Sequence, residues 1–186
     1  MALDIVIPPS AEPLGLEEAK AWLRVDGSGE DALLMALVAA SRAAVEAACG
    51  RLLLTQGWRL RLDAWPEHGP LRLPVSPVTA VTGVTVVTAG GPVDVDPGCW
   101  VLATSRDPPR LVFLRPPPLP DPPAGGIAIT GTAGLAGAPS ALPEAVRQAV
   151  RLTLAALWEN RGDAALPWAV PSAALALLLP FRRIRL

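Results

Sequence analysis

The side chains that could carry out chemistry are few in this sequence, and they stand far apart. His68 is the only histidine, and it lies in the turn-forming segment PEHGP at 66–70. A histidine that acts as a general base needs a nucleophile and an orienting group close by, and the neighbouring sequence offers neither. We therefore interpret His68 as an exposed loop residue.

Two acidic doublets could supply paired carboxylates for acid–base catalysis. They are Glu17-Glu18 and Glu30-Asp31, and each comes where a helical pattern begins. The helix dipole stabilises carboxylates at that position without any catalytic role. Both doublets are therefore interpreted as helix starts.

Metal and phosphate chemistry have no support either. Cys49 and Cys99 belong to no Cys/His cluster with metal-ligand spacing. The glycines at 125–126 and 131–134 lack the GK[ST] ending of a phosphate-binding loop, and no GxSxG segment marks a nucleophilic serine. We expect a protein that is not an enzyme and that has neither a cofactor nor a metal.

Composition and charge exclude further classes. The chain has 186 residues, of which 51% are hydrophobic and 18% charged, enough for one domain with a core or two small ones. A net charge of −1 argues against an overall electrostatic grip on nucleic acid. The N-terminus lacks the basic start of a signal peptide, and no apolar stretch is expected to reach the roughly 20 residues of a membrane span. We expect synthesis in the cytoplasm and no membrane partner.

Two parts of the chain carry a helical pattern. Prolines at 8, 9 and 13 predict an extended arm over residues 1–13. Apolar residues at helical spacing predict two helices within 14–52, the second of which ends at Gly50. They return in 140–180 as a long helix that starts at Pro143 and a short one over 172–179. These two parts are predicted to pack together as a helical bundle.

Between them the apolar period changes to two. The segment WRLRLDAW at 58–65 alternates as a half-buried strand does, and about five short strands are predicted in all. The prolines of 116–123 predict a polyproline-like loop. The predicted fold is therefore α+β: a helical bundle with a small antiparallel β insertion over 53–139, followed by a basic tail over 181–186.

Aromatic residues and the chain end need their own interpretation. Most tryptophans are expected in the core or at its edge, namely Trp58, Trp65, Trp100 and Trp158. Trp168 lies in a loop, where it could be an aromatic interface anchor. The closing sequence ALALLLPFRRIRL at 174–186 could either pack on its own domain or bind another molecule.

Several segments, taken in order, resemble phage head–tail connector (adaptor) proteins. Near the start these are LRVD at 23–26, the pairs Val45-Glu46 and Gly50-Arg51, and the strand at 58–65 followed by LRLPVSPVTAVTGVTV at 71–86. The segment LPEAVRQAVRLTLAALWENRGD at 142–163 is similar to the family's long C-terminal helix, and VPSAALALLLPFR at 170–182 to its ending. The family's usual tyrosine after Trp158 is absent, and Phe181 stands where tyrosine is common.

The resemblance implies a structural protein in the neck of a virion or phage-like particle, where the particle is a phage or a gene transfer agent. It implies a ring, of twelve copies by analogy with the portal, that binds the portal protein and a tail or stopper protein. DNA would pass through the lumen without sequence-specific binding. The portal-docking residues are expected at the chain end, together with the possible anchor Trp168: Leu175, Leu178, Leu179, Phe181, Arg182, Arg183 and Arg185. A chain truncated after Ala174 is then expected to fold but not to bind portal.

Two alternatives stay open at this stage. One is a nucleic-acid-binding module that uses the terminal arginines, which salt-sensitive binding to duplex DNA would support. The other is a different neck protein, such as a tail terminator or a stopper, which its partner would identify.

Overall fold

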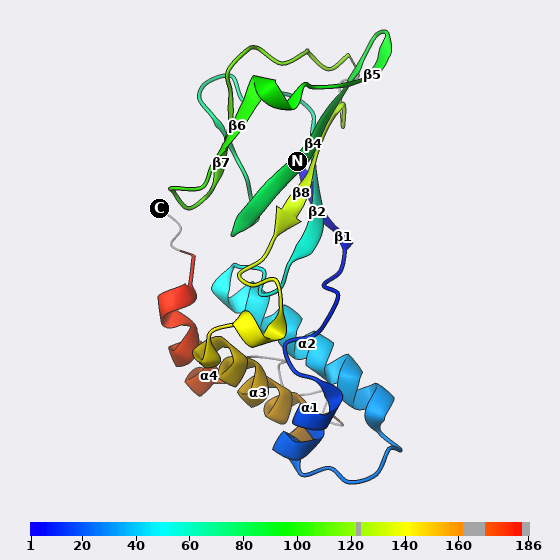
Figure 1. Ribbon diagram of the computed structural model, residues 1–186, viewed down its shortest axis with the longest axis vertical. Coiled ribbons are helices and arrows are strands. Elements are labelled where there is room, and N and C mark those ends of the chain that lie inside the picture. Colours follow the sequence, from blue (N-terminus) through cyan, green and yellow to red (C-terminus); the bar gives the residue numbers. More distant parts are fainter. Residues whose placement is uncertain (122–123, 162–169, 184–186) are drawn as a thin grey trace. The chain divides into compact units, whose positions relative to one another are not determined.

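The computed structural model describes residues 1–121, 124–161 and 170–183. The chain forms two compact units (Figure 1). The β unit consists of Met1–Pro9 and Thr55–Gly134, and the helical unit of Ser10–Leu54 and Leu135–Leu186. The predicted α+β class is confirmed, since four α-helices accompany antiparallel sheets.

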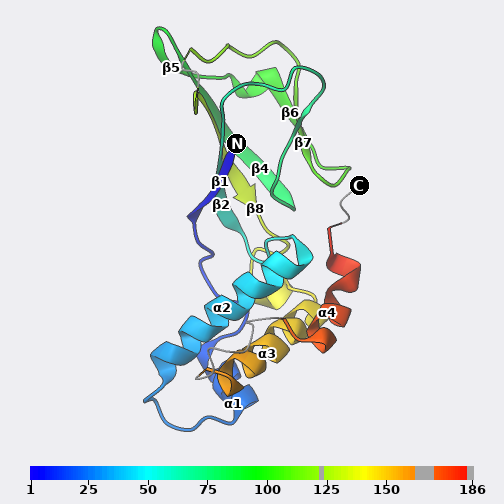
Figure 2. The same cartoon turned by 180° about the vertical axis from the view of Figure 1, so that it is seen from behind.

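The helical unit contains the helices that the apolar spacing predicted. They are α1 (Leu16–Leu23), α2 (Asp31–Cys49), α3 (Glu144–Glu159) and α4 (Ser172–Leu178). Helix α3 packs between α2 and α4, as both views show (Figures 1 and 2). Gly50 ends α2 in the left-handed conformation, with φ of 70°, which glycine adopts without strain.

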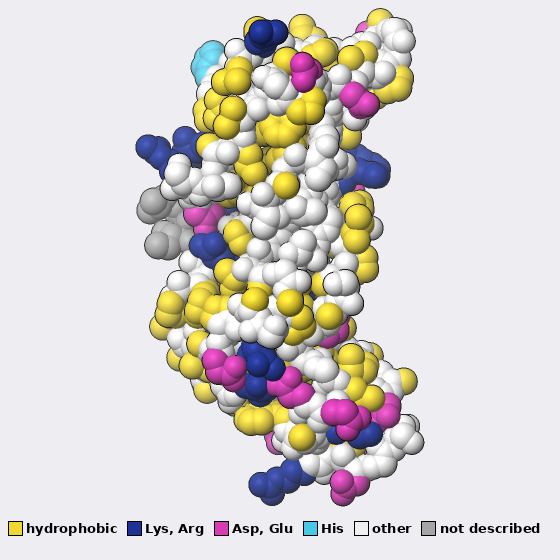
Figure 3. Space-filling view, viewed as in Figure 1, with side chains coloured by type: hydrophobic (Ala, Val, Ile, Leu, Met, Phe, Trp, Pro, Cys, Tyr) yellow, Lys and Arg dark blue, Asp and Glu magenta, His cyan; other side chains and the backbone are white. Residues whose placement is uncertain are grey.

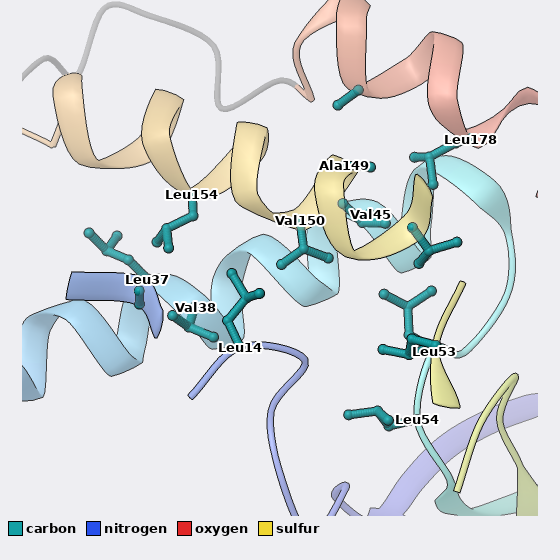
Figure 4. Packing of buried hydrophobic residues seen from close by; sticks show 14 of the residues in the cluster. Leu14, Leu37, Val38, Val45, Leu53, Leu54, Ala149, Val150, Leu154 and Leu178 are labelled. Carbon is teal, nitrogen blue, oxygen red and sulfur yellow. The ribbon is translucent and has the colours of Figure 1, made fainter. Parts of the chain in front are cut away.

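One continuous cluster of apolar side chains holds this unit together. Its largest fully buried members come from several elements and include Leu34 of α2. Figure 4 shows four others: Leu14, Leu53, Leu154 and Leu178. Burying a leucine side chain of this kind contributes on the order of 1.5–3 kcal/mol. The stability of the unit therefore depends on all four helices being in place.

Helix α2 has the length and hydropathy of a membrane span. The expectation that no apolar stretch would be long enough was therefore wrong on these two measures. However, α2 packs against α3 in the core of the helical unit through one face, which includes Leu34, Val38 and Val45. Part of the apolar character of this helix is therefore used inside the unit.

Charged side chains fasten α1 to α3. Arg147 Nη2 lies 2.8 Å from each carboxylate oxygen of Glu18, and Arg151 Nη2 lies 2.7 Å from Glu18 Oε1. Trp22 Nε1 donates to the carbonyl of Arg151 at 3.1 Å. A hydrogen bond from Arg151 lowers the pKa of Glu144. Glu18, one of the acidic doublet residues, thus joins two helices.

The β unit contains two antiparallel sheets. The larger one has the order β1-β2-β8-β4-β5. Its strands are β1 (Ala2–Ile7), β2 (Gln56–Leu62), β4 (Val78–Thr88), β5 (Gly91–Asp94) and β8 (Ile127–Ala133). The smaller sheet has the order β3-β7-β6 and is built from β3 (Leu71–Arg72), β6 (Trp100–Ala103) and β7 (Arg110–Phe113).

Two sequence-based expectations change here. About five strands were predicted, and the described residues contain eight. The short strands β6 and β7 were among those predicted, whereas the two-residue β3 was not. The arm expected over residues 1–13 is extended, but its first part is strand β1, which pairs with β2. Residues 1–9 therefore belong to the β unit.

The core of the β unit is built around Trp58. This side chain is fully buried on β2, together with Leu60 on the same strand and Ile129 on β8. Gly131 pairs with Trp58, and a Cβ atom added there would lie 2.5 Å from the indole ring. Only glycine at this position leaves room for the ring.

The proline-rich loop is fastened to this unit through Trp65. Its Nε1 donates to the carbonyl of Pro118 at 2.8 Å, and its ring lies edge-on against Phe113 at a centroid distance of 4.8 Å. Trp65, Trp100 and Trp158 are all half-buried. The prediction of a place in the core or at its edge is confirmed for these three residues, as it is for Trp58.

Candidate partner-docking site at the C-terminal end

Helix α4 presents different side chains to the core and to the surface. Ala174 and Leu178, four residues apart, are fully buried in the helical unit. Leu175 and Leu179, shifted by one position, are 38% and 61% exposed. The helix therefore has an anchoring face and an apolar face that is open on the described subunit.

The chain after α4 is held by the end of α2. A 3₁₀ turn, Leu179–Phe181, follows α4, and Arg51 Nε donates to the carbonyl of Phe181 at 2.7 Å. Two residues later the amide of Arg183 donates to the carbonyl of Cys49 at 2.8 Å. These two hydrogen bonds fix the direction in which the last described residues leave the helical unit.

Gly50 allows this close approach. A Cβ atom at Gly50 would lie 3.3 Å from Cβ of Arg183, and the positive φ of Gly50 would strain any other residue. Beside it, burial raises the pKa of the Cys49 thiol. Cys49 is thus a buried core residue beneath the chain end.

Glu46 sets the geometry of the α2 end. Its carboxylate accepts from Arg42 Nη1 at 2.9 Å and from the amide of Leu53 at 2.9 Å. Arg42 also pairs with Glu12 at 2.8 Å. Burial by itself lowers the pKa of Arg42, but its hydrogen bonds and charge interactions with Glu12 and Glu46 outweigh this, so the pKa is raised. The network holds the turn after α2 and thereby positions Arg51.

The predicted docking residues are only partly brought together at the surface. Leu175, Leu179 and Arg182 are exposed, whereas Phe181 and Arg183 are half-buried. Leu178 differs, because it points into the core near Ala149 and Val45 (Figure 4). Its side chain cannot contact a partner in this conformation. Arg185 and Trp168 lie outside the described residues.

The burial of Leu178 also changes the expectation for the truncated chain. Cutting after Ala174 would remove Leu178 from the core and the Arg51 hydrogen bond from the α2 end. Such a chain is expected to lose stability as well as any docking surface. Point substitutions of exposed residues are therefore the appropriate test of docking.

Sequence reasoning missed the residues that position the docking segment. Glu46 and Arg51 were noted only as parts of the family resemblance, and Gly50 also as the end of a predicted helix. Arg51 and Phe181 are 130 positions apart in the chain, so no local periodicity connects them. The signal in the sequence was the resemblance of Val45-Glu46 and Gly50-Arg51 to a family motif, to which the structure gives a physical reason.

The structure also shows the surroundings of His68 and of the possible metal ligands. His68 is exposed, and its Nδ1 lies 2.6 Å from the carbonyl of the adjacent Glu67. Within residues 1–121, 124–161 and 170–183, no group of three or more His, Cys, Asp or Glu side chains could hold a metal ion. The arrangement at the C-terminal end offers apolar contact and guanidinium hydrogen bonds, which suit the binding of another protein.

Comparison with known proteins connects this arrangement to a family. A family model described as phage gp6-like head-tail connector protein matches residues 14–88. This range includes the α2 end with Glu46, Gly50 and Arg51. No curated protein matches the chain.

Solved structures match the whole chain. A chain in the virion of a native gene transfer agent particle is 32% identical, with a TM-score of 0.82. A chain in the neck of an empty gene transfer agent particle, computed with C6 symmetry, is 32% identical with a TM-score of 0.84. A third, in the neck of the native particle computed with C12 symmetry, is 34% identical with a TM-score of 0.78. Each match covers 100% of this chain and 97% of the other. The chain therefore belongs to the phage gp6-like head–tail connector family.

Proposed function

We propose that this connector forms a ring in the neck of a gene transfer agent or related phage-like particle, where it binds the portal and joins the capsid to the tail. The observation that carries the proposal is the match over the full chain, at 34% identity, to a neck chain in a C12-symmetric assembly. The ring accordingly has twelve copies. Its subunits make heterologous contacts that close by rotation.

The portal is proposed as the partner of the C-terminal end. Leu175 on α4 and Leu179 in the 3₁₀ turn after it form an exposed apolar pair. The exposed Arg182 adds a guanidinium group three residues after Leu179. Phe181 and Arg183 are half-buried, and the exposed parts of their side chains are proposed to contact the portal as well. Arg185 belongs to the same basic segment of the sequence. A tail or stopper protein binds elsewhere on the ring. Arginine is enriched among the residues that dominate protein interfaces, and exposed apolar side chains gain free energy when a partner removes them from water.

DNA passes through the lumen of the proposed ring without sequence-specific contacts. The net charge of −1 supports this, since a surface that grips phosphates is strongly basic. Several arginines also have carboxylate partners within the subunit, among them Arg42, Arg147 and Arg151. These three arginines therefore form ion pairs within the subunit, and their charges are already balanced by carboxylates.

The docking proposal predicts a large loss of affinity when the apolar pair is made acidic. Leu175→Asp combined with Leu179→Asp is expected to weaken binding to the portal protein of the same particle at least about 100-fold, because two anchors are replaced by charges that must be desolvated. Binding would be measured by analytical ultracentrifugation of the two purified proteins. Circular dichroism should show unchanged helix content, since both positions are exposed.

Leu119→Asp is the matched control, because Leu119 is 78% exposed and lies in the proline-rich loop of the β unit. This variant should bind portal as the unmodified chain does. Equal binding by the double variant and the control would contradict the role of the C-terminal end. Binding of the unmodified chain to the tail protein alone, with none to portal, would contradict the connector assignment itself and favour a tail terminator.

A further inference from the structure

Strand β1 has the sequence of a covered strand but is exposed along its whole length. All six residues of Ala2–Ile7 are exposed. Four large apolar side chains are among them, with Leu3 40%, Ile5 44%, Val6 42% and Ile7 63% exposed. A strand with one solvated face alternates between apolar and polar residues, whereas a near-continuous apolar run is typical of a strand covered on both faces. The Ile-Val-Ile end of β1 follows the second pattern.

A bulge places apolar side chains on both faces of this strand. Leu3 pairs with Leu60 and Ile5 with Trp58, so these two side chains extend the core face of the sheet. The register then shifts, and Ile7 pairs with Gly57 on the opposite face. Cβ of Ile7 lies 2.9 Å from where a Cβ of Gly57 would be. Val6 stands at the shift itself, without a paired residue on β2.

The two edges of the five-stranded sheet differ in protection. At the far edge, β5 is four residues long and includes Pro92 and Asp94. Short length, proline and charge are the usual means by which proteins prevent pairing at a sheet edge. Strand β1 is longer and has one charged residue, Asp4. Figure 3 shows hydrophobic side chains along the margin of the β unit where Figure 1 places β1.

We propose that a neighbouring copy of this chain covers the β1 edge and its four apolar side chains. The inference rests on the proposed ring. In a ring each subunit buries two different surfaces, one against each neighbour, and an exposed apolar edge strand that remained uncovered would invite aggregation. The guarded β5 edge is not one of these surfaces.

A matched pair of valine variants tests the inference. Val6 on β1 and Val93 on β5 are 42% and 43% exposed. Val6→Lys is expected to raise the concentration needed for half-maximal ring assembly on portal more than about tenfold, because a lysine buried there must lose its hydration. Val93→Lys should leave that concentration unchanged. Mass photometry of the portal complexes would count the copies, and thermal unfolding of each free variant would show that it is folded. Equal assembly of both variants overturns the inference.

A photo-crosslinking side chain at position 6 identifies the occupant directly and does not depend on a charged variant. In the assembled portal complex, the expected product is two connector chains joined to each other. A product that joins connector to portal, or no product in an assembled ring, overturns the inference while the proposed function stands. If the unmodified chain forms no ring on portal, the proposed function fails, and the inference fails with it.

Discussion

Replacing Leu178 by alanine is expected to destabilise the helical unit by about 2–5 kcal/mol, the usual cost of removing a leucine side chain from a well-packed core. Leu178 is fully buried and belongs to the cluster that joins α4 to α3 and the end of α2. The lost side chain leaves a cavity, because its neighbours are fixed by three other helices. Urea unfolding followed by helix circular dichroism would measure the change.

Leu179→Ala is the internal control for this prediction. Leu179 is the next residue in the chain and is 61% exposed, so its truncation should change stability by less than about 0.5 kcal/mol. Variants at the two positions therefore distinguish an effect on the stability of the helical unit from an effect on docking. Equal destabilisation by both variants would mean that α4 is rotated from the position described.

Gly131→Ala is expected to cost more than about 3 kcal/mol, at the upper end of what overpacking a core does. The new Cβ atom would lie 2.3 Å from the carbonyl oxygen of Ala80 and 2.5 Å from Cζ2 of Trp58. Neither neighbour can move easily, since one is the backbone of the adjacent strand and the other is a fully buried indole. Urea unfolding followed by tryptophan fluorescence, to which Trp58, Trp65 and Trp100 contribute from the β unit, would measure the change.

Gly83→Ala provides the comparison within the same sheet. A Cβ at Gly83 would lie 3.2 Å from the Thr130 hydroxyl, which is on a side chain that can rotate. A much smaller loss of stability is therefore expected. If both glycine variants were equally stable, the tight packing of Gly131 between Trp58 of β2 and Ala80 of β4 would be wrong.

Much of the helical unit could be predicted from the sequence because its helices are long. In α2 and α3, several turns repeat the same apolar spacing, so the buried face is set by many residues at once. The seven residues of α4 make only two turns, and leucines occupy positions 175, 177, 178 and 179. Spacing alone could not decide which of these leucines is inside. That choice depends on the contact with α3.

The β unit was less predictable, because its short strands form only where partners meet. β3 has two residues, and no periodicity can be seen in so short a segment. The prolines at 8 and 9 predicted an extended arm, and they gave no indication that the residues before them pair as strand β1. The need for glycine at position 131 depends on the register of β2, β4 and β8, which pairs Gly131 with Trp58 and Val81, 73 (131 − 58) and 50 (131 − 81) positions away.

The sequence indicated where the proposed docking site lies but not how it is built. The closing run of leucines and arginines left self-packing and partner-binding open, and the family resemblance favoured partner-binding. Its dependence on the end of α2 could not be predicted from the sequence. The hydrogen bonds from Arg51 to Phe181 and from Arg183 to Cys49 join segments that are 130 or more positions apart in the chain. The family motif at Gly50-Arg51 is explained by this contact.

A cryo-electron microscopy structure of the chain bound to the portal of its own particle would test the connector assignment most directly. The proposed function predicts a closed ring of twelve copies on the portal, with Leu175, Leu179 and Arg182 buried against portal subunits. A ring attached through the β unit, with these residues left in solvent, would contradict the docking site. A chain that attaches to the tail tube and not to the portal would contradict the proposed function.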